Sequence, residues 1–157
     1  MASKTNVMRI LDQKKIEYKV YEVDPKLVID GVTNSELINS DPNSTFKTLV
    51  TKGKSKNYYV FIIPVNESLD LKKAALAVGE KEVEMIPFKD LLSVTGYIHL
   101  GCSPIGMKKQ YVTVIDNCAK SYNRIIISGG KIGLSIELSL SDLNEVLDLK
   151  YENITRS

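Results

Sequence analysis

Histidine, cysteine and tryptophan are scarce in this sequence, which has one, two and none of them in 157 residues. One histidine and two cysteines do not supply the ligand set of a structural zinc site, and two cysteines do not make a disulfide framework. Excess charge is also missing, because 21 basic and 19 acidic residues leave a formal net charge of +2. We therefore expect no bound metal, no cofactor and no non-specific binding of nucleic acid.

Long apolar runs are missing as well. No segment approaches the roughly 18 apolar residues of a membrane span, and the N-terminal stretch MASKTNVMRILDQKK lacks the apolar core of a secretory signal. The sequence thus predicts a cytoplasmic protein without membrane contact. The length and an apolar fraction of 43% fit one domain that spans residues 1–157.

Five stretches have the spacing or the capping residues of short helices. Thr5 can cap the first, and Gly79 can end the third. The second begins with a capping box, Thr-Asn-Ser-Glu at 33–36, and Ser141 can cap the last. The expected ranges are 7–16, 33–40, 68–78, 88–93 and 141–147.

Seven apolar runs rich in β-branched residues are expected to form strands, at 17–23, 45–51, 58–65, 83–86, 110–115, 124–128 and 134–138. The second and third of these runs are joined by KGKSKN and predict a hairpin. Several other neighbours are also joined by tight turns. We therefore predict an α+β protein, with a mixed, largely antiparallel β-sheet curled into a closed or half-closed barrel and helices at its periphery.

The densest signal is the segment GYIHLGCSPIGMKK, from Gly96 to Lys109, which holds three glycines, a Ser-Pro and two lysines. Glycine lets a ligand approach the main chain, so this segment is typical of a site for an anionic or carbonyl-bearing ligand. Its spacing resembles a phosphate loop, but Met107 displaces the lysine and the following hydroxyl residue is absent. A second cluster, Ser128-Gly129-Gly130-Lys131, is interpreted as a turn unless it packs against the first.

Side-chain nucleophiles have little support. The stretches 101–105 and 133–137 end in isoleucine and glutamate instead of the glycine of a nucleophile elbow. His99 has no evident partner for general-base catalysis, and a structural histidine is the simpler interpretation. The Cys102 thiol, beside glycine and serine, is expected to fill a small space rather than to attack a substrate.

Lys47 interrupts the apolar run FKTLV at 46–50, where a strand is expected and lysine is disfavoured. Alternation places Lys47 with Leu49 and Thr51 on one face. Spacing alone favours a lysine that faces solvent. A cation on a rigid strand, opposite a loop rich in N–H donors, would nevertheless suit an anionic or ester-bearing ligand.

Four ordered motifs together resemble the YbaK/EbsC family of aminoacyl-tRNA deacylases, in its Cys-tRNA(Pro) branch. They are FKTL at 46–49, LDLKK with KEVEM at 69–73 and 81–85, the glycine segment at 96–109, and SGGKIGL with IEL at 128–134 and 136–138. The match spans nearly the whole chain. Four motifs at matching intervals are more specific than any one of the loops.

The resemblance implies a small editing domain related to the insertion domain of bacterial prolyl-tRNA synthetases, with a mixed sheet curled into a barrel. It implies removal of cysteine wrongly esterified to tRNA(Pro), and it leaves prolyl-tRNA synthetase open as a partner. The family's essential lysine falls on Lys47. Substrate contacts fall on Tyr21, Thr48, Gly96, Gly101, Cys102, Ser103, Ser128, Gly129 and Ser135.

The resemblance also implies that the substrate's own thiol attacks the aminoacyl ester and leaves as a cyclic thiolactone. Lys47 would then lie near the phosphate or ribose of the terminal adenosine, and N–H groups from Gly101 to Ser103 would bind the carbonyl oxygen. The chain departs from its relatives in two places. Ser135 stands where aspartate is common, and a phenylalanine that walls the pocket in relatives aligns near Ile29 or Asp30.

Other readings stay open on the sequence alone. The same fold could also act on Cys-tRNA(Cys), or remove alanine or another small residue with an activated water. It could also bind tRNA ends or a synthetase without any chemistry. The lysines at 52, 54 and 56 are interpreted either as solvated turn residues or as contacts to tRNA phosphates.

Overall fold

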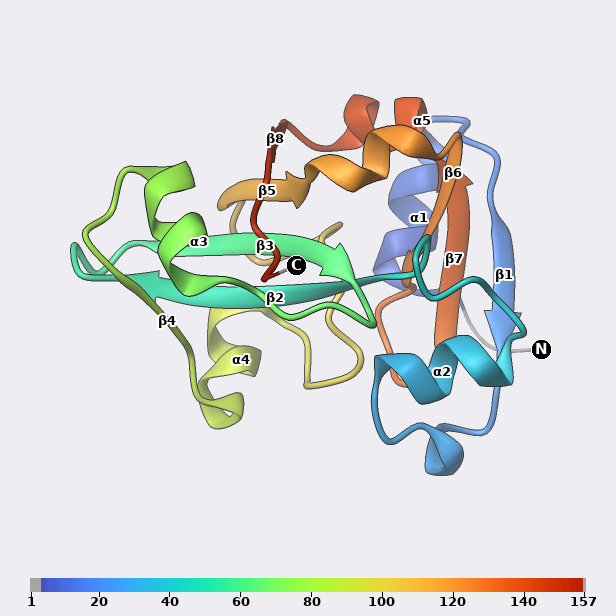
Figure 1. Cartoon of the computed structure of the whole chain (residues 1–157). Coiled ribbons are helices and arrows are strands. Elements are labelled where there is room, and N and C mark those ends of the chain that lie inside the picture. The colour runs from blue at the N-terminus through green and yellow to red at the C-terminus, as the bar shows by residue number, and fades with distance from the viewer. Residues whose placement is uncertain (1–3, 157) are drawn as a thin grey trace.

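The computed structural model describes residues 4–156, whose strands form two sheets (Figure 1). The strands are β1 (Lys19–Glu22), β2 (Phe46–Gly53), β3 (Tyr58–Pro64), β4 (Val83–Met85), β5 (Val112–Asp116), β6 (Arg124–Ser128), β7 (Leu134–Ser139) and β8 (Leu149–Glu152). The larger sheet has the order β4-β2-β3-β5-β8, and the smaller one has the order β1-β7-β6. In Figure 1 the strands of the small sheet run across the direction of the long β2–β3 hairpin.

Five predicted helices are found near their expected positions. They are α1 (Asn6–Gln13), α2 (Gly31–Leu37), α3 (Leu71–Val78), α4 (Phe88–Thr95) and α5 (Leu140–Val146), with short 3₁₀ helices η1 (Pro25–Leu27) and η2 (Asn117–Ser121). The expected caps of α2 and α5 are wrong. Asp30 accepts a 2.7 Å hydrogen bond from the Thr33 N–H and starts α2 before the capping box. Ser139, not Ser141, caps α5.

The predicted α+β class is confirmed, but the predicted barrel is wrong. Strand β2 pairs antiparallel with β3 and β4, and β7 pairs antiparallel with β1 and β6. Strand β5 pairs parallel with β3 and β8. Within residues 4–156 neither sheet closes on itself, and backbone pairing links the two sheets at a short bridge, where the Ile126 N–H donates to the Ser44 carbonyl at 3.0 Å.

Strand β8 was not expected from the sequence. It lies at the edge of the large sheet, with Leu149 opposite Thr113 of β5. Its sequence, LKYE, is short and alternates charged residues with apolar or aromatic ones, so it lacks the β-branched run that marks the other strands. Strand β8 is therefore stabilised by its pairing with β5 rather than by the strand propensity of its own residues.

Strand β2 separates two apolar clusters, because its side chains alternate between the faces of the large sheet. Phe46 and Val50 belong to the cluster that also takes in the small sheet and α1. Leu49 packs against the second cluster, which is formed with α3. Lys47 and Thr48 therefore lie on a strand that is held from both sides.

Candidate active site

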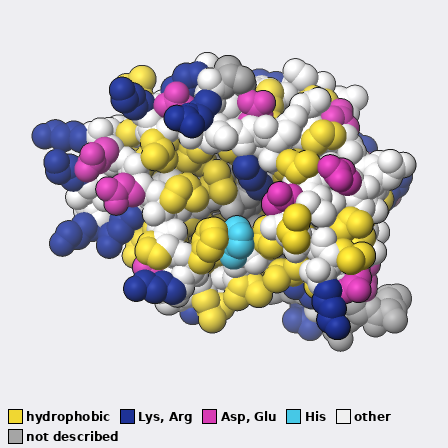
Figure 2. All heavy atoms as spheres, turned by 60° about the horizontal axis from the view of Figure 1, so that its bottom comes forward, with side chains coloured by type: hydrophobic (Ala, Val, Ile, Leu, Met, Phe, Trp, Pro, Cys, Tyr) yellow, Lys and Arg dark blue, Asp and Glu magenta, His cyan; other side chains and the backbone are white. Residues whose placement is uncertain are grey.

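A cavity of about 380 Å³ opens between the two sheets, which is a typical size for a small-molecule site. It is lined by residues from six segments, at 28–34, 45–50, 85–91, 99–102, 126–128 and 133–135, together with Val65. Figure 2 shows the single histidine at the rim of a hollow, with hydrophobic side chains around it. The cavity thus joins parts of the chain that are far apart in sequence.

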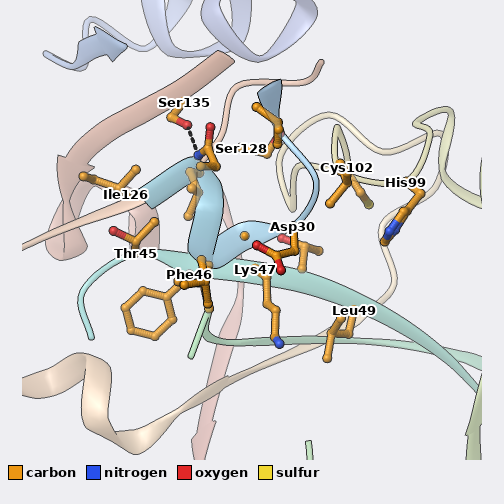
Figure 3. A pocket seen from close by; sticks show the side chains of 18 of the residues that line it. Asp30, Thr45, Phe46, Lys47, Leu49, His99, Cys102, Ile126, Ser128 and Ser135 are labelled. Atoms are coloured by element: carbon orange, nitrogen blue, oxygen red, sulfur yellow. Dashed lines mark hydrogen bonds between the residues drawn. The ribbon is translucent and has the colours of Figure 1, made fainter. Parts of the chain in front are cut away.

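Five of the residues predicted to act on or contact a substrate line this cavity. Lys47 and Thr48 come from β2, Cys102 from the first glycine segment, Ser128 from the end of β6, and Ser135 from β7. Figure 3 shows several of these side chains around one space. The structure therefore places around one cavity five residues whose proximity the sequence indicated only through the family motifs.

Lys47 is half-buried in the cavity wall, so the expectation from spacing alone of a solvent-facing lysine is wrong. Burial lowers the pKa of its ammonium, and the nearby charges of Asp30 and Glu67 oppose that shift. Neither of the two ion pairs between side chains of residues 4–156 involves Lys47. Its charge is thus available to a ligand rather than held in a close ion pair.

The two glycine segments pack against each other. A Cβ placed on Gly101 would lie 3.0 Å from the Ile132 nitrogen and 3.0 Å from the Lys131 Cα, so only glycine permits this approach. The Gly101 N–H donates to the Ile98 carbonyl at 3.0 Å and is not free for a ligand. The second glycine cluster is therefore not an isolated turn, since it supports the first.

Four predicted contact residues do not line the cavity. Gly101 is one. Gly96 ends α4 in a left-handed conformation, with φ of +90°. Ser103 is fully buried, and its hydroxyl accepts from the Ile105 N–H at 3.2 Å. The Gly129 N–H donates to the Leu134 carbonyl at 2.8 Å, and its carbonyl accepts from Thr5 at 2.7 Å. In the structure these residues shape the loops behind the cavity wall.

Tyr21 also lies outside the main cavity. Its hydroxyl donates to Glu137 at 2.7 Å, and the Glu137 carboxylate also pairs with Arg124 at 2.9 Å. These three residues line a second, more polar hollow. Tyr21 is the direct antiparallel partner of Ser135, which lines the main cavity, but the Tyr21 side chain lines the second hollow instead.

Cys102 and His99 line the cavity without forming a nucleophile–base pair. Burial raises the pKa of the Cys102 thiol to about 12, so this thiol stays protonated at neutral pH. Burial lowers the pKa of His99, whose ring stacks on Phe88 with 3.8 Å between centroids. No hydrogen bond within residues 4–156 joins His99 to a serine or cysteine. The interpretation of Cys102 as a small buried side chain agrees with its 7% exposure.

Sequence analysis did not single out Asn34 as a site residue. Asn34 lies on α2 and lines the cavity, and its side-chain NH₂ donates to the Ser135 hydroxyl at 2.9 Å. The only sequence signal at this position was the capping-box pattern, which suggested a helix start. Of the two positions near which the relatives' phenylalanine aligns, Asp30 lines the cavity, whereas Ile29 is 74% exposed and does not.

Neither a metal cluster nor a membrane helix is found in the part of the chain that the structure describes. Residues 4–156 contain no group of three or more histidine, cysteine, aspartate or glutamate side chains arranged to hold a metal ion. None of their helices combines the length and apolarity that crossing a bilayer requires.

Comparisons with known proteins identify the family of this chain. The model of the aminoacyl-tRNA editing domain family matches residues 33–146, and the chain belongs to this family. It is 44% identical over 155 residues to EbsC of Enterococcus faecalis (strain ATCC 700802 / V583), a proposed Cys-tRNA(Pro)/Cys-tRNA(Cys) deacylase, which covers 97% of this chain and 93% of EbsC.

Two solved structures share the fold at 18% sequence identity. One, described as a proposed trans-editing enzyme for prolyl tRNA synthetase, gives a TM-score of 0.85 over 99% of this chain and 100% of its own. The other, hypothetical protein APE2540, gives a TM-score of 0.86 over 96% and 99%. These likenesses establish the fold.

Proposed function

We propose that this protein is a deacylase of misacylated tRNA that removes cysteine from Cys-tRNA(Pro), with Cys-tRNA(Cys) as a further substrate. The observation that carries the proposal is the 44% identity, over nearly the whole chain, to a proposed deacylase of the same two substrates. The family match over residues 33–146 supports the same class of reaction. We place the protein in the cytoplasm, where its substrate is made.

The cavity supports a reaction driven by the substrate's own thiol. The thiol sulfur bonds to the ester carbonyl carbon, the bond from that carbon to the ribose oxygen breaks, and the thiol proton ends on that oxygen. Such a mechanism needs position and charge rather than a protein nucleophile. A protonated Cys102 and the absence of a serine–histidine or cysteine–histidine hydrogen bond in residues 4–156 are consistent with it.

Lys47 supplies the charge in this mechanism. Its half-buried ammonium faces negative charge on the terminal adenosine or on the developing carbonyl oxygen, in a partly enclosed cavity. The N–H group of Cys102, which lines the cavity, is the proposed donor to the carbonyl oxygen. Within residues 4–156 no backbone–backbone hydrogen bond uses this group, whereas the Gly101 N–H is already engaged and Ser103 lies behind the cavity wall.

Release of amino acid from charged tRNA tests the proposal. Purified protein is mixed with tRNA(Pro) carrying cysteine or proline, and free amino acid is measured after subtraction of spontaneous hydrolysis. Cysteine should be released and proline retained. Tight binding of both charged tRNAs without release would instead identify a binding module. Prolyl-tRNA synthetase, our proposed partner, should co-elute with the protein and tRNA(Pro) in gel filtration if it delivers the substrate.

A further inference from the structure

Strand β2 runs along the main cavity and gives it two unlike ends. The residue before the strand, Thr45, forms a bridge with Ile126 of the small sheet. The far part of the strand pairs with β4, where Thr51 lies opposite Met85. The end near the small sheet carries polar side chains such as Ser135, whereas the β4 end is almost entirely apolar. The β4 end is lined by Leu49, Met85, Ile86, Phe88, Leu91 and His99.

A stacked pair of rings stands at the β4 end. Phe88, the first residue of α4, and His99 lie with their ring centroids 3.8 Å apart and their planes 16° from parallel. Phe88 is 64% exposed, although phenylalanine is among the residues most often buried in soluble proteins. Neither ring takes part in the other aromatic pair or in the two cation–π contacts of residues 4–156. The pair therefore keeps ring surface available for a flat ligand.

The surface beside this pair is apolar as well. Met85 and Leu92 are exposed, and Leu92 lies one helical turn after Phe88 on α4. Figure 2 shows hydrophobic side chains on both sides of the histidine, at the rim of the hollow. Exposed apolar side chains that gather in one place mark a binding surface.

The deacylase substrate carries a group that fits this end of the cavity. The adenine of the terminal adenosine is attached to the same ribose as the ester, so a cavity that holds the ester beside Lys47 must also place the base nearby. Figure 3 shows Ser135 and His99 on opposite sides of Lys47. On the His99 side the base meets aromatic rings, and every nucleobase has a π-face that stacks on such rings.

We propose that Phe88 and His99 form a platform on which the terminal adenine of the charged tRNA stacks. This inference rests on the deacylase function proposed above and adds the residues that bind the nucleoside. With the base at the β4 end, the ribose and the ester lie beside Lys47, and the amino acid points toward the end near the small sheet.

Binding of uncleavable probes tests the platform. Both probes are short hairpin RNAs that end in unpaired CCA and carry cysteine through an amide, and in one of them hydrogen replaces the terminal adenine. The wild type should bind the probe with adenine about 5-fold to 100-fold more tightly, as stacking of a single base predicts. The double variant Phe88→Leu with His99→Leu keeps apolar side chains but has no rings, and it should bind the two probes equally. The control Leu76→Ala, at an exposed apolar position of α3, should keep the full preference.

A conservative variant and a fluorescent base separate stacking from a structural role. His99→Phe keeps a ring and should keep the preference for adenine. With 2-aminopurine as the terminal base, whose emission is quenched by stacking, the bound probe should be dimmer with the wild type than with the double variant.

Equal binding of the two probes by the wild type, or a full preference for adenine in the folded double variant, would overturn the platform. If the double variant does not fold, Phe88→Leu and His99→Leu are measured singly, and a full preference in both would have the same meaning. No probe is cleaved in these measurements, so a failure of the deacylase function is seen separately, as absence of cysteine release from the ester.

Discussion

Replacing Lys47 by methionine removes a half-buried ammonium while keeping most of the side-chain volume. At a separation of about 4 Å and an effective dielectric constant near 20, an ammonium attracts a unit negative charge by about 4 kcal/mol. If the ammonium makes this interaction only in the transition state, its removal slows the reaction roughly a thousandfold. We expect Lys47→Met to slow single-turnover deacylation of cysteinyl-tRNA(Pro) by about 100-fold to 1000-fold.

The fold should tolerate this change, because neither ion pair between side chains of residues 4–156 involves Lys47. The free energy of unfolding should change by less than about 1 kcal/mol. Lys19→Met, the same substitution at an exposed position of β1, is the matched control and should leave the rate unchanged. Wild-type turnover by folded Lys47→Met would refute the role of the ammonium.

Three further outcomes follow from the structure. The raised pKa of the Cys102 thiol, about 12, keeps this thiol neutral until the pH approaches that value. Iodoacetamide at pH 8 should therefore label Cys102 about a thousandfold more slowly in the folded protein than in urea. Comparable labelling rates would contradict the burial of Cys102. Gly133→Ala should lower the free energy of unfolding, measured in urea, by about 3 kcal/mol, because the new Cβ would lie 2.6 Å from the Val23 carbonyl oxygen. Gly79→Ala, which has open space around it, should lower this free energy by about 1 kcal/mol. Equal losses for the two variants would be inconsistent with this packing. Replacing the hairpin lysines 52, 54 and 56 by glutamine should lower the salt slope of tRNA binding by about 2 if they contact phosphates, and an unchanged slope would identify them as solvated.

Local signals in the sequence were sufficient for most secondary structure. The apolar runs on either side of KGKSKN form the β2–β3 hairpin, and Gly79 ends α3 with φ of +72°, as a glycine terminator should. Helix starts were less predictable, because several polar residues near a helix can cap it. Asp30 has this role at α2 although Thr33 fits the capping-box pattern better.

Long-range features could not be predicted from local signals. Closure of a sheet depends on which edges meet, and here β4 and β8 remain at the edges of the large sheet. The burial of Lys47 depends on the segments that surround β2, so alternation along the strand alone gave the wrong exposure.

The candidate site was predicted in part, through motifs rather than spacing. Five residues that the family resemblance singled out line one cavity, whereas Tyr21 lies at another hollow. Asn34 was missed as a cavity-lining residue because its hydrogen bond joins it to Ser135, 101 positions away, and no local pattern records such a contact.

The central claim is that the substrate's thiol, and not a group of the protein, attacks the ester. The most direct measurement compares the deacylation rates of cysteinyl-tRNA(Pro) and alanyl-tRNA(Pro) by the wild type, with mass spectrometry of the products in the first turnover. The account predicts rapid release from the cysteinyl substrate with a cyclic thiolactone detected, and little release from the alanyl substrate. Equal rates for the two substrates would contradict it.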